Sequence, residues 1–205
     1  KWCKPSFYIE LSKLFLYNEY GIMNGHSFKK MGDENMSLVS RVQQIASEHP
    51  EKIAYNFMGK DTTYAAFEQS VELFAGALKS IGVEKGDNIG FLLGNSPHFL
   101  ISLYATMRIG ATAVPIIPIY SPDEISYIVK NSDAKVIIAL DALLPLVEKA
   151  AGVFTSVENY IICETQPDTV QKLAALPENL KTKVKPFSVM ISSAAMGTSA
   201  VETDP

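Results

Sequence analysis

The fold is decided by residues 88–118, which read NIGFLLGNSPHFLISLYATMRIGATAVPIIP. The segment Asn88–Leu93 is a continuous apolar run, which is typical of a strand buried on both faces. Ser96 then provides a helix N-cap, and a proline occupies the favoured first position of a helix over Pro97–Ile109. A glycine ends this helix, and Thr112–Pro115 is a second short strand. The stretch predicts a strand–helix–strand unit with parallel strands.

Toward the N-terminus, Ser37 caps a helix that ends before the proline of His49-Pro50. Ile53–Phe57 and Asp61–Tyr64 flank a glycine-containing turn and predict a β-hairpin. We expect this hairpin to add antiparallel strands at an edge of the sheet. A long helix follows, with one apolar stripe formed by Tyr64, Phe67, Val71, Phe74, Leu78 and Ile81.

Toward the C-terminus, strands and helices continue to alternate. Ser121 and Glu124 form a capping box, Val136–Leu140 and Tyr160–Cys163 are apolar strands, and Ala142–Ala150 is a helix. A short helix is expected around 169–176. The whole pattern predicts an α/β fold, with an open, mostly parallel sheet and helices on both faces.

The two ends of the chain differ from its body. Residues 1–35 are rich in aromatic side chains, and the purine-rich codons expected upstream of Met36 resemble a ribosome-binding site. One hypothesis is that translation starts at Met36 and that the leader is upstream sequence; the other is a genuine extension packed on the domain. Residues 36–187 form the domain. Residues 188–205 are small and polar without periodicity, which favours a flexible tail at a truncation point.

Composition excludes several classes of protein. The chain has 205 residues and a net charge of −4, whereas a nucleic-acid footprint needs a basic patch. No segment approaches the roughly 20 apolar residues of a transmembrane helix. Cys3 and Cys163 form no disulfide framework, which favours a cytoplasmic location. The histidines are scattered at positions 26, 49 and 98, so a zinc site is not expected.

No catalytic motif stands out in the sequence. Glycine-rich phosphate loops and the Gly-x-Ser-x-Gly nucleophile elbow are absent. Asp123-Glu124 is explained by a helix N-terminus, and Ser192-Ser193 and 197–199 lack the strand, helix and lysine of a phosphate site. Asn95-Ser96-Pro97-His98 lies where a strand end meets a helix N-terminus, a common ligand position. The alternative, that these residues only cap the helix, is favoured.

Four segments together resemble the AMP-binding, adenylate-forming superfamily. They are Thr63-Tyr64 at the start of the long helix, Leu78–Asp87, Leu92–Pro97 and Met107–Pro118. Their order and spacing between Met36 and about Cys163 match the family, and the style is closest to bacterial long-chain fatty acid–CoA ligases. The departures from the usual motifs are Ala66-Phe67 for Glu-Leu, Arg108-Ile109 for Lys-Ala, and Ile117 for Asn or Asp.

The resemblance implies the N-terminal part of an acyl-CoA synthetase-like large domain. The full family converts a fatty acid, ATP and CoA to acyl-CoA, AMP and pyrophosphate with Mg²⁺, but its phosphate loop and catalytic residues lie downstream of the region seen here. No catalytic, cofactor-binding or metal-ligating residue is therefore assigned. We therefore expect this chain to be a truncated ligase that is inactive alone. The alternative is a non-catalytic fragment that complements a separate C-terminal half or acts as an interaction module. A homodimer is also possible from the resemblance.

Overall fold

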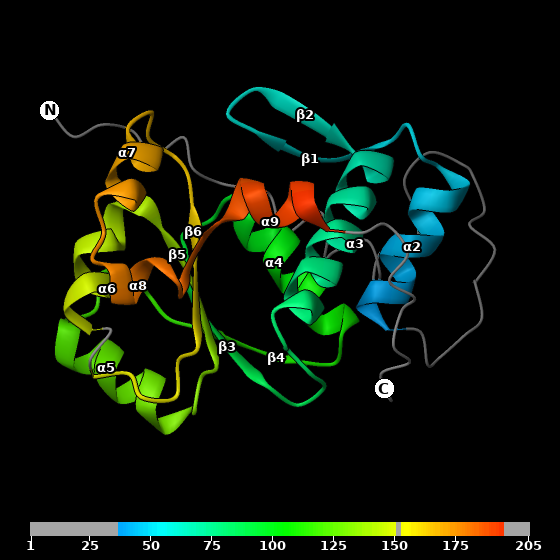
Figure 1. Ribbon diagram of the computed structural model, residues 1–205. Helices are drawn as coiled ribbons and strands as arrows, with labels where there is room; N and C mark the ends of the chain where they lie inside the picture. Colours follow the sequence, from blue (N-terminus) through cyan, green and yellow to red (C-terminus); the bar gives the residue numbers. More distant parts are fainter. Residues whose placement is uncertain (1–36, 151–152, 195–205) are drawn as a thin grey trace, which may run out of the picture.

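The computed structural model describes residues 37–150 and 153–194 (Figure 1). The expectation for residues 1–35 therefore lies outside the described residues. The helices are α2 (Leu38–Glu48), α3 (Tyr64–Ser80), α4 (Pro97–Arg108), α5 (Pro122–Asn131), η2 (Asp141–Leu143), α6 (Leu144–Ala150), α7 (Thr169–Ala174), α8 (Glu178–Lys181) and α9 (Phe187–Ser193). The strands are β1 (Ile53–Phe57), β2 (Lys60–Thr63), β3 (Asn88–Leu92), β4 (Thr112–Pro115), β5 (Val136–Leu140), β6 (Asn159–Cys163) and β7 (Val184–Pro186).

In the described residues, β3 to β7 form a five-stranded parallel sheet in the order β4-β3-β5-β6-β7. The chain first moves from β3 to β4 on one side, and then crosses back to place β5 on the other side of β3. From β5 onward each strand is added outward. The strand order therefore reverses between β3 and β5, which makes this gap the switch point of the sheet.

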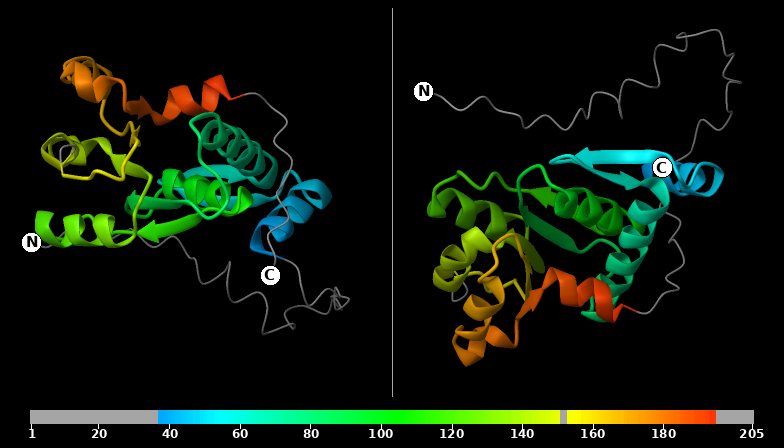
Figure 2. Two further views of the ribbon diagram at one scale, coloured as in Figure 1. Left: turned by 60° about the horizontal axis from the view of Figure 1, so that its bottom comes forward. Right: turned by 90° about the horizontal axis from the view of Figure 1, so that it is seen from above.

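Helices cover both faces of the sheet, as the sequence predicts (Figures 1 and 2). Neighbouring strand residues alternate between two cores. Ile89, Val136 and Ile161 belong to the core with α2, α3, α4 and α9. Ile137, Tyr160 and Ile162 belong to the core with α5, α6 and α8. Because both sets are buried, the strands read as continuous apolar runs.

Local sequence explains the boundaries of the helices. The side chains of Ser37, Thr63, Ser96 and Ser121 each accept a hydrogen bond from a backbone N–H in the first turn that follows. Ser121 and Glu124 complete a capping box. Gly90 of β3 packs closely against β5, because an added Cβ would lie 2.5 Å from Ile137 Cδ1 and would force that side chain to shift.

The β1–β2 hairpin is confirmed as an element, but its expected place is wrong. It forms a separate two-stranded antiparallel sheet and pairs with no strand of the five-stranded sheet. The right-hand view of Figure 2 shows it to one side of the sheet. Tyr55 packs edge-on against Phe67 of α3, with ring centroids 5.7 Å apart. Packing on α3, rather than pairing with the five-stranded sheet, therefore attaches the hairpin to the rest of the domain.

The expectation of an irregular tail from Ser188 is also wrong for the residues described. Phe187–Ser193 form α9, and Phe187 and Met190 are buried in the core against α3. The N-terminus of α9 has no capping side chain of its own, but the Ser188 N–H donates to Glu164 at 3.2 Å. An acceptor 24 residues earlier thus replaces the local cap. Residues 195–205 lie outside the described part.

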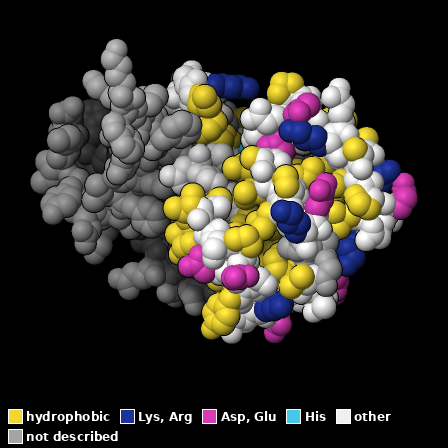
Figure 3. Space-filling view, turned by 90° about the vertical axis from the view of Figure 1, so that its left-hand side faces the viewer, with side chains coloured by type: hydrophobic (Ala, Val, Ile, Leu, Met, Phe, Trp, Pro, Cys, Tyr) yellow, Lys and Arg dark blue, Asp and Glu magenta, His cyan; other side chains and the backbone are white. Residues whose placement is uncertain are grey.

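The left-hand face of Figure 1, which carries α5 and α6, mixes acidic, basic and apolar side chains without a basic patch (Figure 3). Tyr127 on α5 is among the exposed apolar residues, at 70% exposure. Within the described residues, no helix has the length and apolar character needed to cross a bilayer.

Candidate functional site

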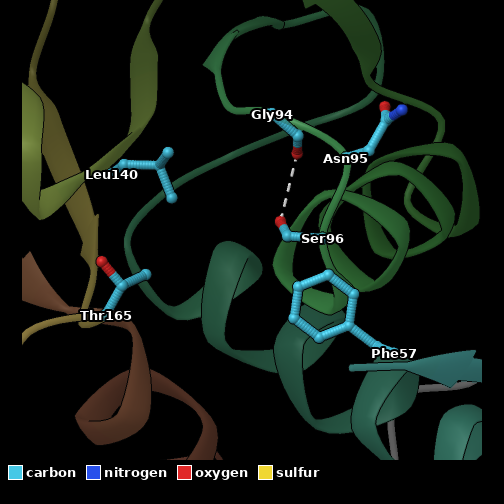
Figure 4. A pocket seen from close by; sticks show the side chains of 6 residues that line it. All are labelled: Phe57, Gly94, Asn95, Ser96, Leu140 and Thr165. Atoms are coloured by element: carbon cyan, nitrogen blue, oxygen red, sulfur yellow. Dashed lines mark hydrogen bonds between the residues drawn. The ribbon is translucent and has the colours of Figure 1, made fainter. Parts of the chain in front are cut away.

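A hollow of about 420 Å³ opens at the carboxyl edge of the sheet (Figure 4). Its lining comes from the ends of several elements: Phe57, Gly94, Asn95, Ser96, Leu140 and Thr165. In Figure 4, Leu140 and Thr165 lie on one side and face Ser96 and Phe57, whereas the Asn95 side chain points away from them. The hollow is therefore bounded by β1, β5, and the loops after β3 and β6.

The position of the hollow follows from the strand order. Gly94–Ser96 follow β3, and Leu140 ends β5, so the hollow lies at the carboxyl ends of the two strands that flank the switch point. Open α/β sheets bind ligands in the crevice that such a reversal creates, because the two connecting segments diverge there. Topology and geometry thus identify the same candidate site.

Most polar groups of the hollow already have partners within the protein. Ser96 Oγ donates to Gly94 O at 3.2 Å and accepts from the Phe99 N–H at 3.3 Å. Thr165 Oγ1 donates to Asp141 at 2.6 Å. The lining carries no ionisable side chain. It offers apolar contact from Phe57 and Leu140 and neutral hydrogen bonding, but no acid, base or nucleophile.

Asp141 fixes the rim of the hollow. It follows β5 directly, is 3% exposed, and accepts hydrogen bonds from the N–H groups of Thr165 and Gln166 at 2.7 Å each. The hydroxyls of Thr165 and Thr169 also donate to it. Burial alone raises the pKa of Asp141, but these hydrogen bonds together lower it to about 2. At neutral pH it is an ionised structural group and not a proton donor.

His98 does not line the hollow. Its ring packs edge-on against Phe187 of α9, with centroids 4.9 Å apart. Burial lowers the pKa of His98, and the negative charges of Glu164 and Asp141 oppose this shift. His98 therefore belongs to the contact between α4 and α9, and the favoured capping interpretation of the Asn95–His98 segment holds for Ser96 and Pro97.

The other polar residues considered from the sequence are structural. Ser193 Oγ bonds back to the Val189 carbonyl at 2.7 Å, and Glu124 is used in its capping box. The Cys163 thiol is fully buried at the end of β6, and burial raises its pKa well above the usual range, which makes it a poor nucleophile. His49 is the C-cap of α2. No group of three or more metal-ligating side chains occurs in the described ranges.

Sequence reasoning missed Phe57, Leu140 and Thr165, which complete the hollow, and the role of Asp141. Each lies in a different element from Asn95, so no local spacing relates them. One usable signal exists: Asp141 and Thr165 each follow an apolar strand closely, and carboxyl ends of neighbouring parallel strands meet at one edge. Using it requires the knowledge that β5 and β6 are neighbours.

The sequence profile of the AMP-binding enzyme family matches residues 42–200. This chain therefore belongs to the AMP-binding enzyme family. It is 31% identical over 134 residues to the long-chain-fatty-acid–CoA ligase of Bacillus subtilis, a match covering 62% of this chain and 24% of that protein. It is 29% identical over 147 residues to the acetyl-coenzyme A synthetase of Streptomyces avermitilis, covering 65% of this chain and 22% of that protein. The chain thus spans about a quarter of these curated relatives.

Solved structures share the fold. The anthranilate CoA ligase AuaEII, in complex with anthranoyl-AMP, superimposes with a TM-score of 0.71 at 22% identity, over 83% of this chain and 30% of that chain. A benzoate CoA ligase from Burkholderia xenovorans gives a TM-score of 0.65 at 21% identity, over 80% and 30% of the two chains. These matches confirm the predicted α/β fold class, and this chain covers 30% of each of the two solved chains.

The residues present do not fit Mg²⁺-bound ATP. A triphosphate needs cationic side chains or an array of backbone N–H groups, and Mg²⁺ needs carboxylate oxygens. The six lining residues of the hollow carry no cationic side chain and no carboxylate, and the nearby Asp141 is fully used by Thr165, Gln166 and Thr169. No reaction step through these groups is therefore derived from this chain.

Proposed function

We propose that this chain is the N-terminal part of an AMP-forming acid–CoA ligase, with a long-chain fatty acid as the acid. The complete reaction uses ATP, Mg²⁺ and CoA and releases AMP and pyrophosphate. Support comes from the AMP-binding family match and from relatives named as long-chain-fatty-acid–CoA ligases. The observation that carries the proposal is the hollow at the switch point, where this fold class binds ligands.

The hollow receives an uncharged part of a ligand. Phe57 and Leu140 supply apolar surface, and Ser96 and Thr165 have neutral hydroxyls already engaged in hydrogen bonds. Such a lining favours an apolar group over a phosphate, because an unpaired phosphate charge loses its hydration there. Phosphate binding and catalysis then come from other parts of the ligase, and the 205-residue chain is inactive alone. Its two isolated cysteines suit the cytoplasm.

A second candidate is a non-catalytic fragment that complements a separately encoded C-terminal half. The observation favouring it is coverage: the match to AuaEII includes 83% of this chain but only 30% of the AuaEII chain. The nucleotide sequence after codon 205 separates the two. A Thr/Ser-Gly-rich loop ending in Pro-Lys-Gly in the same frame supports the ligase, and the same motif in another gene supports complementation. Its absence from both leaves a binding module and contradicts the ligase proposal.

Activity provides the biochemical test. The 205-residue chain with ATP, Mg²⁺, CoA and palmitate is expected to release no pyrophosphate above the protein-free control. Turnover by this chain contradicts the assignment of catalysis to other parts of the ligase. The ligase joined to its C-terminal part, or mixed with it, is expected to form palmitoyl-CoA.

Gly94 allows a direct test of the hollow. A Cβ at this position meets no atom within 4 Å, so substitution is not expected to disturb the fold. In the complete ligase, Gly94→Leu should fill the hollow and lower kcat/KM on the order of tenfold, whereas Gly94→Ala should stay close to the wild type. Equal kcat/KM for both variants would show that the hollow is not a ligand site, independently of the reaction class.

A further inference from the structure

Thr165 is held by two hydrogen bonds to one carboxylate. Its N–H donates to Asp141 Oδ2 at 2.7 Å, and its hydroxyl donates to Asp141 Oδ1 at 2.6 Å. Rotation of the side chain about χ1 would break the second bond while the first holds the backbone in place. Asp141 also accepts hydrogen bonds from the Gln166 N–H and the Thr169 hydroxyl, so the carboxylate is fixed as well. Asp141 therefore determines the orientation of Thr165.

The other branch of the Thr165 side chain points toward the hollow. In Figure 4 its methyl carbon lies on the side of Ser96, and its oxygen lies on the opposite side. Asp141 is 3% exposed and does not line the hollow, which agrees with a hydroxyl that is drawn away from it. The methyl group thus extends the apolar surface that Leu140 provides on the same side.

Neither hydroxyl of the lining has a proton left for a ligand, because a hydroxyl carries only one. The proton of Thr165 goes to Asp141, which is ionised at neutral pH and can only accept. The proton of Ser96 goes to the Gly94 carbonyl at 3.2 Å. A carboxylate or phosphate oxygen placed here would lose its hydration without gaining a hydroxyl donor. A hydrocarbon group would instead leave water for contact with a methyl group.

We propose that Asp141 is a positioning residue, which holds the Thr165 hydroxyl away from the hollow so that the Thr165 methyl contacts the hydrocarbon part of the acid. The inference rests on the proposed function, because the acid is the substrate of the ligase. It adds a residue that acts on specificity without touching the ligand. The side chain of Thr165 makes the contact, and Asp141 acts through it.

Two substitutions of Thr165 separate its methyl from its hydroxyl. Thr165→Ser keeps the bond to Asp141 and loses the methyl, whereas Thr165→Val keeps a methyl and loses the bond. In the complete ligase, the KM for palmitate should be about tenfold higher in Thr165→Ser than in Thr165→Val. The urea midpoint should fall further in Thr165→Val. A merely structural role of Thr165 would give Thr165→Val the higher KM as well, and that ranking overturns the proposal.

A double-mutant cycle tests the role of Asp141. Asp141→Asn replaces one of the two acceptor oxygens by a donor, so it should raise the KM for palmitate on the order of fivefold. When Thr165→Val is also present, the same change should raise KM less than about twofold, because either branch of valine offers a methyl. Thr169→Val removes another hydroxyl from Asp141 away from the hollow and is the matched control. An equal effect of Asp141→Asn in both backgrounds overturns the proposal.

The orientation of Thr165 can be measured without substrate. In the 205-residue chain, three-bond NMR couplings from the Thr165 methyl carbon to the backbone should show one χ1 rotamer, and Asp141→Asn should show averaging. Averaged couplings in the wild-type chain overturn the proposal and leave the proposed function intact. Absence of palmitoyl-CoA with the complete wild-type ligase contradicts the proposed function, and the couplings still decide whether Asp141 orients Thr165. If the variants do not fold, the wild-type couplings decide.

Discussion

The carboxylate of Asp141 accepts two hydrogen bonds from Thr165, one from its N–H at 2.7 Å and one from its hydroxyl at 2.6 Å. This pair joins the ends of β5 and β6 beside the hollow. Because Asp141 is buried and ionised, each bond is charge-assisted and stronger than a neutral one. The rim of the candidate site is thereby held by one side chain.

Asp141→Asn should lower the free energy of unfolding by about 2 kcal/mol at neutral pH, because the neutral amide replaces a charged acceptor of several hydrogen bonds. Urea unfolding followed by circular dichroism measures the loss. The control is Asp168→Asn, which removes an exposed ion pair with Lys172 and should cost less than about 1 kcal/mol. Equal losses in both variants would contradict the special role of Asp141.

Acid should lower the free energy of unfolding of the wild-type protein through protonation of Asp141. The folded pKa of Asp141 is about 2, below its ordinary value of 3.8. A depressed carboxyl pKa stabilises the fold above pH 3.8, and the contribution, about 2 kcal/mol, is lost as pH falls toward 2. Unfolding midpoints measured across this window should drop less steeply in Asp141→Asn. An unchanged slope would assign the acid sensitivity to other carboxyl groups.

His98 predicts a second pH effect near neutrality. Burial lowers its folded pKa below 6.5, so the unfolded chain binds the proton more readily. Its contribution to stability is present above pH 6.5 and is lost as pH falls below that value. Comparing unfolding midpoints at about pH 7.5 and about pH 5.5, His98→Gln should show a smaller drop than the wild type.

Phe187 should account for most of the stability that holds α9 in place. The centroid of its ring lies 4.4 Å from the ring centroid of Phe74, and the ring also packs against His98. Phe187→Ala should cost about 3 kcal/mol and speed amide exchange over residues 187–193. Val189 is 52% exposed on the same helix, and Val189→Ala should change stability by less than about 0.5 kcal/mol. Similar effects of the two substitutions would show that α9 is not docked through Phe187.

Arg108 and Glu68 form an ion pair between α4 and α3, with the arginine side chain 2% exposed. Glu68→Gln leaves a buried charge without its partner and should cost about 3 kcal/mol or more. The double variant Glu68→Gln, Arg108→Met removes that charge and should recover part of the loss. Chemical unfolding of the two variants gives the comparison. A double variant less stable than Glu68→Gln would show that Arg108 stabilises mainly through packing.

Sequence alone predicted the elements whose signals are local. Ser96 and Ser121 mark helix starts through their own caps, and the run Val136–Leu140 indicates a strand buried on both faces. It failed for α9 because the acceptor at its N-terminus is the distant Glu164. It misplaced the hairpin because alternation in Ile53–Phe57 indicates a strand but not the sheet it joins.

The candidate site was predicted only in part for the same reason. Asn95 and Ser96 follow a strand and precede a helix, a pattern visible in a short window. Thr165 and Leu140 join them through the strand order, in which β5 lies between β3 and β6. That order depends on which long-range contacts are most favourable, and no periodicity encodes it.

The neighbours of β3 also set a delay during protein synthesis. β4 follows β3 after one helix, but the partner on its other side, β5, begins roughly 40 residues after β3 ends, which the ribosome needs on the order of 2–8 s to add. Until β5 is synthesised, the residues of β5 that pair with Ile89 and Phe91 in the folded structure, Val136 and Ile138, are absent. Synonymous codons that slow translation between Thr112 and Val136 should lengthen this interval and increase the demand of the nascent chain for chaperones.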